Sequence, residues 1–107
     1  MQSALKKLYV TILLPALNSI SIPSGVSKIY IKNCPNITSY SVDGNNKNYC
    51  SVNGVIYDKN LKTLCFYPVG NCDEVFNLPD GITRIEDKAF KNCINLKKLI
   101  SQKALLK

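Results

Sequence analysis

Two stretches of this chain repeat one another, and an internal repeat constrains the fold more than any other feature of a sequence. "IPSGVSKIYIKNC" begins at Ile22, and "LPDGITRIEDKAFKNC" begins at Leu78. The two copies align from their Pro-x-Gly turns onward, until three extra residues enter the second copy. Beyond them, the shared triplet Lys-Asn-Cys brings the copies back into step. A spacing that is interrupted only by one short insertion is typical of a structural repeat.

Apolar residues alternate in several short runs that follow the pattern L-x-x-L-x-L, in full or in part. Alternation directs one side of a short strand into a core. A single strand cannot bury that side alone, so several must stack. The runs lie at 5–10, 17–22, 37–42, 76–78 and 96–99. We therefore expect a β-rich α/β solenoid that spans 1–107 as one domain, with repeat-like segments at about 5–22, 20–42 and 76–101.

A turn is expected after the strand of each copy. Pro23 and Pro79 withhold a backbone donor and so end the strand. Gly25 and Gly81 suit turn positions that need positive φ. In the second copy, "RIEDKAFKNC" predicts a short helical turn, because acidic residues near its start complement the helix dipole. In the first copy, the shorter and β-branched "KIYIKNC" predicts an extended segment instead.

The stretch between the copies predicts an inserted β-hairpin at about 43–75. "SVNGVIY" and "LKTLCFYP" are rich in β-branched and aromatic residues, and residues 58–60 supply a turn between them. The candidates for inward-facing or same-face residues of this hairpin are Val55, Tyr57, Leu64 and Phe66. We interpret the hairpin as a continuation of the stack.

Three tyrosines of the same region have two interpretations. Tyr49, Tyr57 and Tyr67 pack one face of the hairpin, or they form an aromatic patch that contacts a ligand. We favour packing, because a hairpin face must be buried to be stable.

The segment "LPDGITRIEDKAFKNCINLKKL" (78–99) resembles the BspA-type leucine-rich repeat, whose pattern is about I-P-x-x-V-x-x-I-x-x-x-A-F-x-x-C-x-x-L. The matching residues are Leu78, Pro79, Ile82, Ile85, Ala89, Phe90, Cys93 and Leu96. The copy at 20–42 is similar but lacks the Ala-Phe pair, and 42–70 resembles a hairpin insertion of the same family. The resemblance implies a non-enzymatic module of a cell-surface or secreted protein that adheres to host proteins, matrix or other cells.

The charge of the chain disfavours nucleic-acid binding. It carries 14 Lys and Arg against 7 Asp and Glu, a net charge of +7, but Arg84 is its sole arginine. Arginine supplies the planar fork that reads bases and phosphates, and the lysines are spread along the chain with no recognised motif. Loose attraction to polyanionic surfaces is compatible with this charge.

Five cysteines and no histidine limit the chemistry that the chain can perform. Without histidine, zinc-finger spacing and thiol–histidine catalysis are both excluded. We interpret Cys34 and Cys93, which occupy the same place in the two copies, as small buried residues under a turn. A disulfide among Cys50, Cys65 and Cys72 is one alternative, since the sequence alone does not determine whether two of them are paired.

No motif for an enzyme, a metal or a cofactor is found. Asp43 and Asp58 fall in expected turns, where their side chains cap the backbone. The carboxylate pairs at 73–74 and 86–87 have no histidine or aromatic neighbours of the kind that acid–base catalysis uses, and phosphate-loop and EF-hand spacings are absent. We therefore expect a protein that is not an enzyme, with no catalytic residues, no metal site and no cofactor.

The first 21 residues have two interpretations. Lys6 and Lys7 precede an apolar run and so mimic a signal peptide. The segment at 4–10 also resembles the one at 95–101, "NLKKLIS", and we favour a repeat over a signal peptide for this reason. No apolar run is long enough for a membrane-spanning helix.

A solenoid presents the outward side chains of its strands as a continuous surface. The candidate ligand-binding residues on this surface are Ser19, Ser21, Ser39, Ser41, Asn77, Lys98 and Ile100. The expected partner is a protein or a hydroxyl-rich glycan at a surface.

Two other function classes remain open from the sequence. One is a structural spacer or truncated repeat fragment without its own ligand, which self-associates through open solenoid ends. The other is a basic domain that binds nucleic acid or anionic lipid, and its binding would weaken steeply with salt.

Overall fold

A computed structural model describes residues 7–10, 18–31, 36–71, 74–91, 93 and 96–101. Expectations for Cys34 and Cys72, and for Leu5 and Leu17, concern residues outside these ranges. The elements in chain order are β1 Lys7–Val10, β2 Ser19–Ile22, β3 Lys28–Ile31, β4 Ser39–Val42, β5 Tyr49–Val52, β6 Val55–Asp58, β7 Thr63–Phe66, η1 Val69–Asn71, β8 Val75–Leu78, β9 Arg84–Ile85 and β10 Lys98–Ser101.

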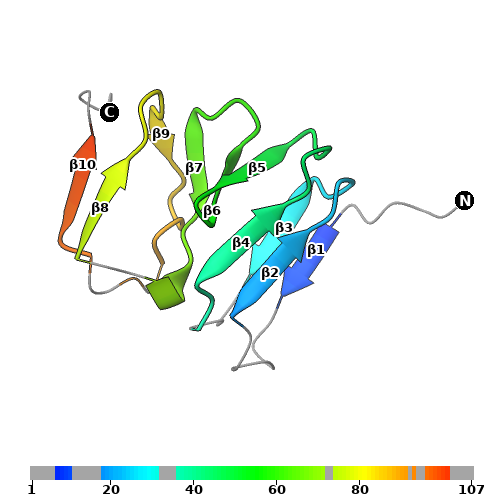
Figure 1. Ribbon diagram of the computed structural model, residues 1–107, viewed down its shortest axis with the longest axis horizontal. Coiled ribbons are helices and arrows are strands. Elements are labelled where there is room, and N and C mark those ends of the chain that lie inside the picture. Colours follow the sequence, from blue (N-terminus) through cyan, green and yellow to red (C-terminus); the bar gives the residue numbers. More distant parts are fainter. Residues whose placement is uncertain are drawn as a thin grey trace, which may run out of the picture.

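Parallel strand pairs form both sides of an elongated stack (Figure 1). β1 pairs with β3 and β2 pairs with β4 in its N-terminal part. β7 pairs with β9 and β8 pairs with β10 in its C-terminal part. Each successive coil therefore supplies one strand to either side, which confirms the predicted β-rich solenoid.

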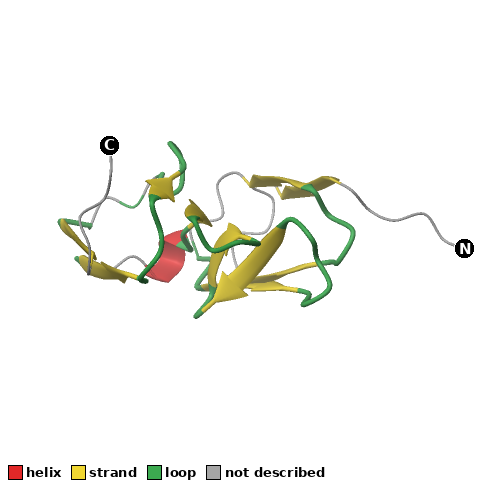
Figure 2. Cartoon of the chain, turned by 90° about the horizontal axis from the view of Figure 1, so that it is seen from above, coloured by secondary structure: helices red, strands yellow, loops and turns green. Residues whose placement is uncertain are grey.

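The apolar alternation of the sequence explains which side of each strand is buried. In β2 and β4, Ile20, Ile22 and Tyr40 face the interior, while the serines between them are exposed. Ile29 of β3 reaches the same core from the opposite side of the coil, as the two separated strand pairs in Figure 2 indicate. Burying an aliphatic side chain of this size contributes about 1.5–3 kcal/mol, so the stacking of coils supplies the stability that no single strand has.

The insertion is a three-stranded antiparallel unit rather than the simple hairpin that the sequence predicted. The expected β6–β7 hairpin and its turn at 58–60 are confirmed. However, "SVNGVIY" is not one strand, because it folds back on itself between Val52 and Val55 to form β5 and β6. Asn53 and Gly54 make this two-residue turn with φ of 53° and 83°, as expected for Asn-Gly in a hairpin of matching twist.

A β-bulge decides which core each residue of β7 enters. Tyr57 pairs with Leu64 and Ile56 pairs with Phe66, so Cys65 is the additional residue. Leu64 therefore faces the same core as Tyr57, whereas Phe66 packs against the N-terminal core with Ile56. Phe66 thus points inward, as one of the two expectations for it required, but it does not share a face with Val55, Tyr57 and Leu64, because the bulge reverses the alternation.

The insertion separates two hydrophobic cores. The N-terminal core contains residues of β2, β3 and β4 together with Ile56. The C-terminal core contains residues of β7 and β8 together with Val55 and Tyr57. Since neighbouring residues of β6 enter different cores, this strand is buried on both faces, and it forms a wall between the two halves of the stack.

The helical component of the predicted α/β label is wrong for the described residues. The segment expected as a helical turn begins as β9 and continues as successive turns, in which Ala89, Lys91 and Cys93 each donate a backbone N–H to the carbonyl three residues earlier. The extended conformation predicted for the first copy is confirmed as β3. Gly81 has the expected positive φ of 93°, but Gly25 does not.

Candidate functional site

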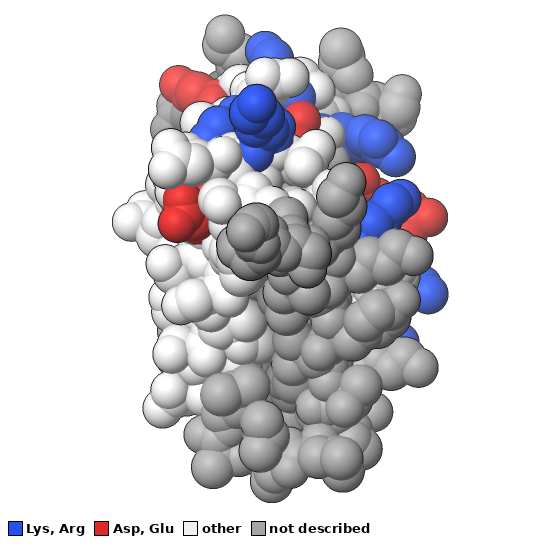
Figure 3. Space-filling view, turned by 90° about the vertical axis from the view of Figure 1, so that its right-hand side faces the viewer, with Lys and Arg blue, Asp and Glu red and all other residues white. Residues whose placement is uncertain are grey.

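The serines predicted for the outward face lie side by side in two paired strands. Ser19 pairs with Ser39 and Ser21 pairs with Ser41 across β2 and β4, and all four are exposed. Viewed from the end where β1 and β2 lie, the lower left of the described surface carries no charged side chain (Figure 3). Charged residues gather instead toward the top and right of that view.

The other three predicted residues form a second exposed pair of strands. Asn77 of β8 pairs with Ile100 of β10, and Lys98 pairs with Val75. All are exposed, including 45% of Val75 and 39% of Ile100. The predicted positions therefore fall into two patches at opposite ends of the stack, and the insertion lies between them.

The edge of the insertion is tied to the serine patch. Tyr40 of β4 donates its N–H to the Gly54 carbonyl at 2.9 Å, and Val42 donates its N–H to the Ser51 hydroxyl at 3.0 Å. These bonds connect β4 to the β5–β6 turn, although no strand ladder joins them. The serine patch consequently ends at the turn formed by Asn53 and Gly54.

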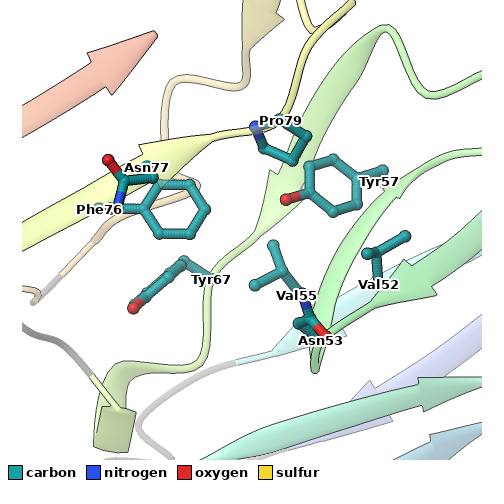
Figure 4. Close-up of a pocket in the computed structure, with 8 residues that line it drawn as sticks. All are labelled: Val52, Asn53, Val55, Tyr57, Tyr67, Phe76, Asn77 and Pro79. Atoms are coloured by element: carbon teal, nitrogen blue, oxygen red, sulfur yellow. The ribbon is translucent and has the colours of Figure 1, made fainter. Parts of the chain in front are cut away.

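A pocket of about 210 Å³ lies between this turn and β8. The hairpin side contributes Val52, Asn53, Val55 and Tyr57. Tyr67, Phe76, Asn77 and Pro79 line the opposite side (Figure 4). None of these side chains carries a formal charge at neutral pH. Of the candidate residues taken from the sequence as outward-facing, the pocket includes Asn77.

Packed aromatic rings form the wall beside β8. The Tyr67 ring lies 5.1 Å from the Phe76 ring in an edge-on arrangement and 4.9 Å from the Phe90 ring in a stacked one. Phe76 and Phe90 are 5.9 Å apart. Aromatic pairs at these separations gain about 0.5–1.5 kcal/mol beyond their burial, so the three rings stabilise one another beside the pocket.

The Tyr57 hydroxyl is the polar group most directly associated with this pocket. Only 1% of Tyr57 is exposed, and its hydroxyl points toward the space beside Phe76, Tyr67 and Val55 (Figure 4). It makes no hydrogen bond to any described residue. No described buried polar atom is both fully enclosed and unpaired, so this hydroxyl is reached from the pocket.

Burial raises the pKa of Tyr57 to about 12, with smaller contributions from Cys50 and Tyr67. The hydroxyl is therefore neutral at physiological pH, and it can donate or accept a hydrogen bond. A neutral group of this kind suits an uncharged polar ligand.

Of the three tyrosines considered from the sequence, two reach the pocket and one does not. Tyr57 and Tyr67 are buried in the C-terminal core and line the pocket with their rings. Tyr49 packs against the N-terminal core, and its hydroxyl donates to the Ser27 carbonyl at 3.3 Å. All three tyrosines are packed against a core, but on opposite faces of the insertion, so they form neither one shared hairpin face nor a single patch.

Sequence reasoning missed most of the residues that line the pocket. Val52 and Asn53 were placed inside one strand, although the Asn-Gly dipeptide is a strong signal for a hairpin turn. Phe76 and Pro79 were assigned only to the repeat pattern. Their meeting with the hairpin depends on the stacking of distant segments, which no local signal contains.

The thiols and carboxylates of the described residues have structural roles. Cys50 and Cys65 are free thiols, so they form no disulfide with each other. Cys93 is buried as expected but is disulfide-bonded rather than free. Asp58 accepts backbone N–H bonds from Lys62 and Thr63, which confirms the capping predicted for it. Asp43 accepts one from Asn45.

The described residues contain no group of three or more His, Cys, Asp or Glu placed to hold a metal ion. Within the same ranges, no helix has the length and apolarity that crossing a membrane requires.

Three solved structures are similar to this chain. The pneumococcal vaccine antigen PcpA has a TM-score of 0.70 and 24% identity over 83% of this chain. A leucine-rich repeat protein from Eubacterium ventriosum has a TM-score of 0.68 and 31% identity over 78%. A leucine rich cell surface protein from Faecalibacterium prausnitzii has a TM-score of 0.58 and 25% identity over 84%. No protein-family model and no curated protein matches the chain.

The chain spans about a quarter of the length of these three proteins, covering 23%, 23% and 27% of them. Each likeness covers at least 78% of this chain. The solenoid deduced from the repeats is thus the fold of bacterial leucine-rich repeat proteins.

Proposed function

We propose that this chain, a leucine-rich-repeat protein, is a non-enzymatic interaction module that adheres to a partner protein through the outward face of its parallel strands. Its solved neighbours are consistent with the BspA-like family that residues 78–99 resemble, and one of them is described as a cell surface protein. We place the module at the cell surface or in a secreted protein on this likeness.

The observation that supports the proposal most directly is the register of β2 and β4. Their paired serines, at 19 with 39 and at 21 with 41, form an exposed ladder on a rigid backbone. Serine loses little side-chain entropy on binding, and its hydroxyl both donates and accepts hydrogen bonds. A surface of this kind fits a partner whose backbone or polar side chains lie across the strands.

The test is binding of the purified chain to a panel of immobilised extracellular-matrix proteins, compared with a Ser21→Arg/Ser41→Arg variant. Two bulky cations on the ladder should weaken binding of the partner at least tenfold, because their side chains obstruct the exposed face. Asn60→Arg, which adds the same cation in the exposed turn after β6, is the matched control and should bind normally.

The outcomes separate the proposal from the other function classes. Binding that weakens steeply as salt rises, and that both arginine variants retain or strengthen, would indicate charge-driven attraction of a basic chain and contradict the use of the serine face. Absence of binding to any partner, together with salt-resistant oligomers, would indicate a structural spacer.

A further inference from the structure

The pocket between the β5–β6 turn and β8 has a feature that the packing of the core does not explain. The Tyr57 side chain is almost completely buried, yet its hydroxyl has no hydrogen-bond partner within the described structure. The hydroxyl is not fully enclosed, because no buried side-chain polar atom of the described residues lacks a partner. A phenylalanine would fill the same space in the core, so packing does not require the hydroxyl, which is available to a partner that enters from the pocket.

The rest of the lining limits what that partner is. Its walls are the apolar or aromatic surfaces of Val55, Tyr67 and Phe76, and the amides of Asn53 and Asn77 lie at exposed positions on its rim. An apolar wall with a few hydrogen-bonding groups at its edge is typical of sites for small ligands. With no charged side chain in the lining, an anionic or cationic ligand gains no ion pair there.

The volume of the pocket sets the size of the ligand. About 210 Å³ is below the roughly 300–1,000 Å³ of pockets for drug-sized ligands, so it admits a group of about one ring. A purely aliphatic side chain would fit the walls but would desolvate the Tyr57 hydroxyl without replacing its hydrogen bond. A ring with both an apolar face and hydroxyl groups can pack against the apolar walls and also form a hydrogen bond with the Tyr57 hydroxyl.

We infer that this pocket binds one neutral pyranose of a glycan. The apolar face of the sugar packs on the rings of Tyr67 and Phe76. A sugar hydroxyl bonds to the Tyr57 hydroxyl, and the rim amides bond to further hydroxyls. This site is distinct from the serine ladder of the proposed function, so an experiment can contradict one of the two proposals without contradicting the other.

The test is a titration of the isotope-labelled chain with neutral methyl glycosides, followed by NMR. The panel contains the glucoside, galactoside, mannoside and N-acetylglucosaminide, with glucuronic acid as a charged sugar and N-acetylproline amide as a peptide probe. At least one neutral glycoside should shift signals of Asn53, Phe76 and Asn77, with a Kd on the order of 1 mM for a single ring. Glucuronic acid should bind more weakly.

Two variants test the assigned contacts. Tyr57→Phe keeps the ring and should weaken binding of the neutral glycoside about tenfold, the effect of one lost hydrogen bond. Asn77→Ala changes an exposed rim residue and should also weaken it without affecting folding. The matched control is Tyr49→Phe, which removes a hydroxyl on the opposite core and should leave the Kd unchanged.

Three results would overturn the inference. The first is a panel in which no neutral glycoside shifts the pocket signals. The second is unchanged affinity in both Tyr57→Phe and Asn77→Ala. The third is binding of N-acetylproline amide alone, which would assign the pocket to a protein side chain. The Ser21→Arg/Ser41→Arg variant should retain full glycoside binding, so failure of the serine-face proposal is recognised separately.

Discussion

At the scale of the residue, one fully buried asparagine holds the turn between β4 and β5 against the first coil. The Asn46 amide nitrogen donates to the carbonyls of Pro23 and Val26, both at 2.9 Å. Its carbonyl oxygen accepts from the N–H groups of Asn48 and Tyr49 at 2.7 and 2.8 Å. The sequence indicated only a loop here, because the acceptors lie more than a dozen residues away.

Replacing this asparagine should destabilise the fold strongly. Asn46→Ala leaves buried backbone groups unpaired, at about 1–3 kcal/mol. Asn46→Asp should cost more near neutral pH, because a carboxylate cannot donate to the two carbonyls. Urea denaturation measures both, with Asn45→Ala at a neighbouring exposed position as the control. Unchanged stability of Asn46→Asp relative to the unmodified chain would show that the donated bonds contribute nothing.

Two glycines should respond to substitution in opposite ways. A Cβ at Gly70 would lie 2.6 Å from the Ile37 carbonyl oxygen, whereas a Cβ at Gly44 would meet nothing within 4 Å. Gly70→Ala must therefore move η1 away from the turn segment at 36–37 that precedes β4, and it should destabilise the chain by about 1–3 kcal/mol. Gly44→Ala should be neutral or slightly stabilising in thermal denaturation. Similar melting temperatures for the two variants would contradict this close approach.

The buried thiol of β7 should make stability depend on alkaline pH. Burial, with smaller contributions from Glu86 and Asp58, raises the pKa of Cys65 from 9.0 to about 12. The folded chain therefore keeps this proton while the unfolded chain loses it above pH 9, so stability falls as pH rises from 9 toward 12. Tyr57 adds a fall of the same sign above pH 10.

The measurement is the free energy of unfolding at pH 8 and pH 10. Cys65→Ala should reduce the loss of stability between these two values. Cys50→Ala should reduce it less, because the raised pKa of Cys50 reflects a half-buried thiol. An identical pH dependence in Cys65→Ala and the unmodified chain would show that this thiol is accessible to water.

At the scale of the element, the Asn-Gly turn both ends the serine ladder and borders the pocket. Gly54 combines a φ of 83° with a Cβ position only 3.0 Å from the Ser39 hydroxyl oxygen. Gly54→Ala should cost about 1–2 kcal/mol from the left-handed backbone and should loosen the β5–β6 pairing first. Amide hydrogen exchange measures this, and Asn53→Gly, which tolerates positive φ, should leave exchange unchanged. Uniform exchange across all strands in Gly54→Ala would contradict a local role.

The elements differ in how much of them the sequence predicts. β2 and β4 follow directly from apolar alternation, and Ile20, Ile22 and Tyr40 are buried as that pattern requires. The helical turn was wrong because the segment that buries Ala89 and half-buries Phe90 is a series of tight turns, whose local composition resembles a helix start. The bulge at Cys65 was not predicted, since a pattern of alternating apolar residues does not indicate where the pairing register shifts.

At the scale of the whole molecule, the stack has two cores joined by one shared wall. Ile56 enters the first core and Val55 and Tyr57 enter the second. A coil in a solenoid contacts only its neighbours, so the wall is the route by which the two halves fold together. The candidate surface was predictable as outward residues of strands, but the pocket was not, because its two sides come from β6 and β8.

The proposed binding face depends on the parallel register of β2 against β4, because the serine ladder exists only in that register. Through-space NMR contacts between the backbone protons of the two strands test it directly. We predict parallel contacts that match Ser19 with Ser39 and Ser21 with Ser41, with Ile20 and Tyr40 both buried. An antiparallel pattern, or a slip of one residue that turns the isoleucines of β2 outward, would contradict both the fold and the proposed binding face.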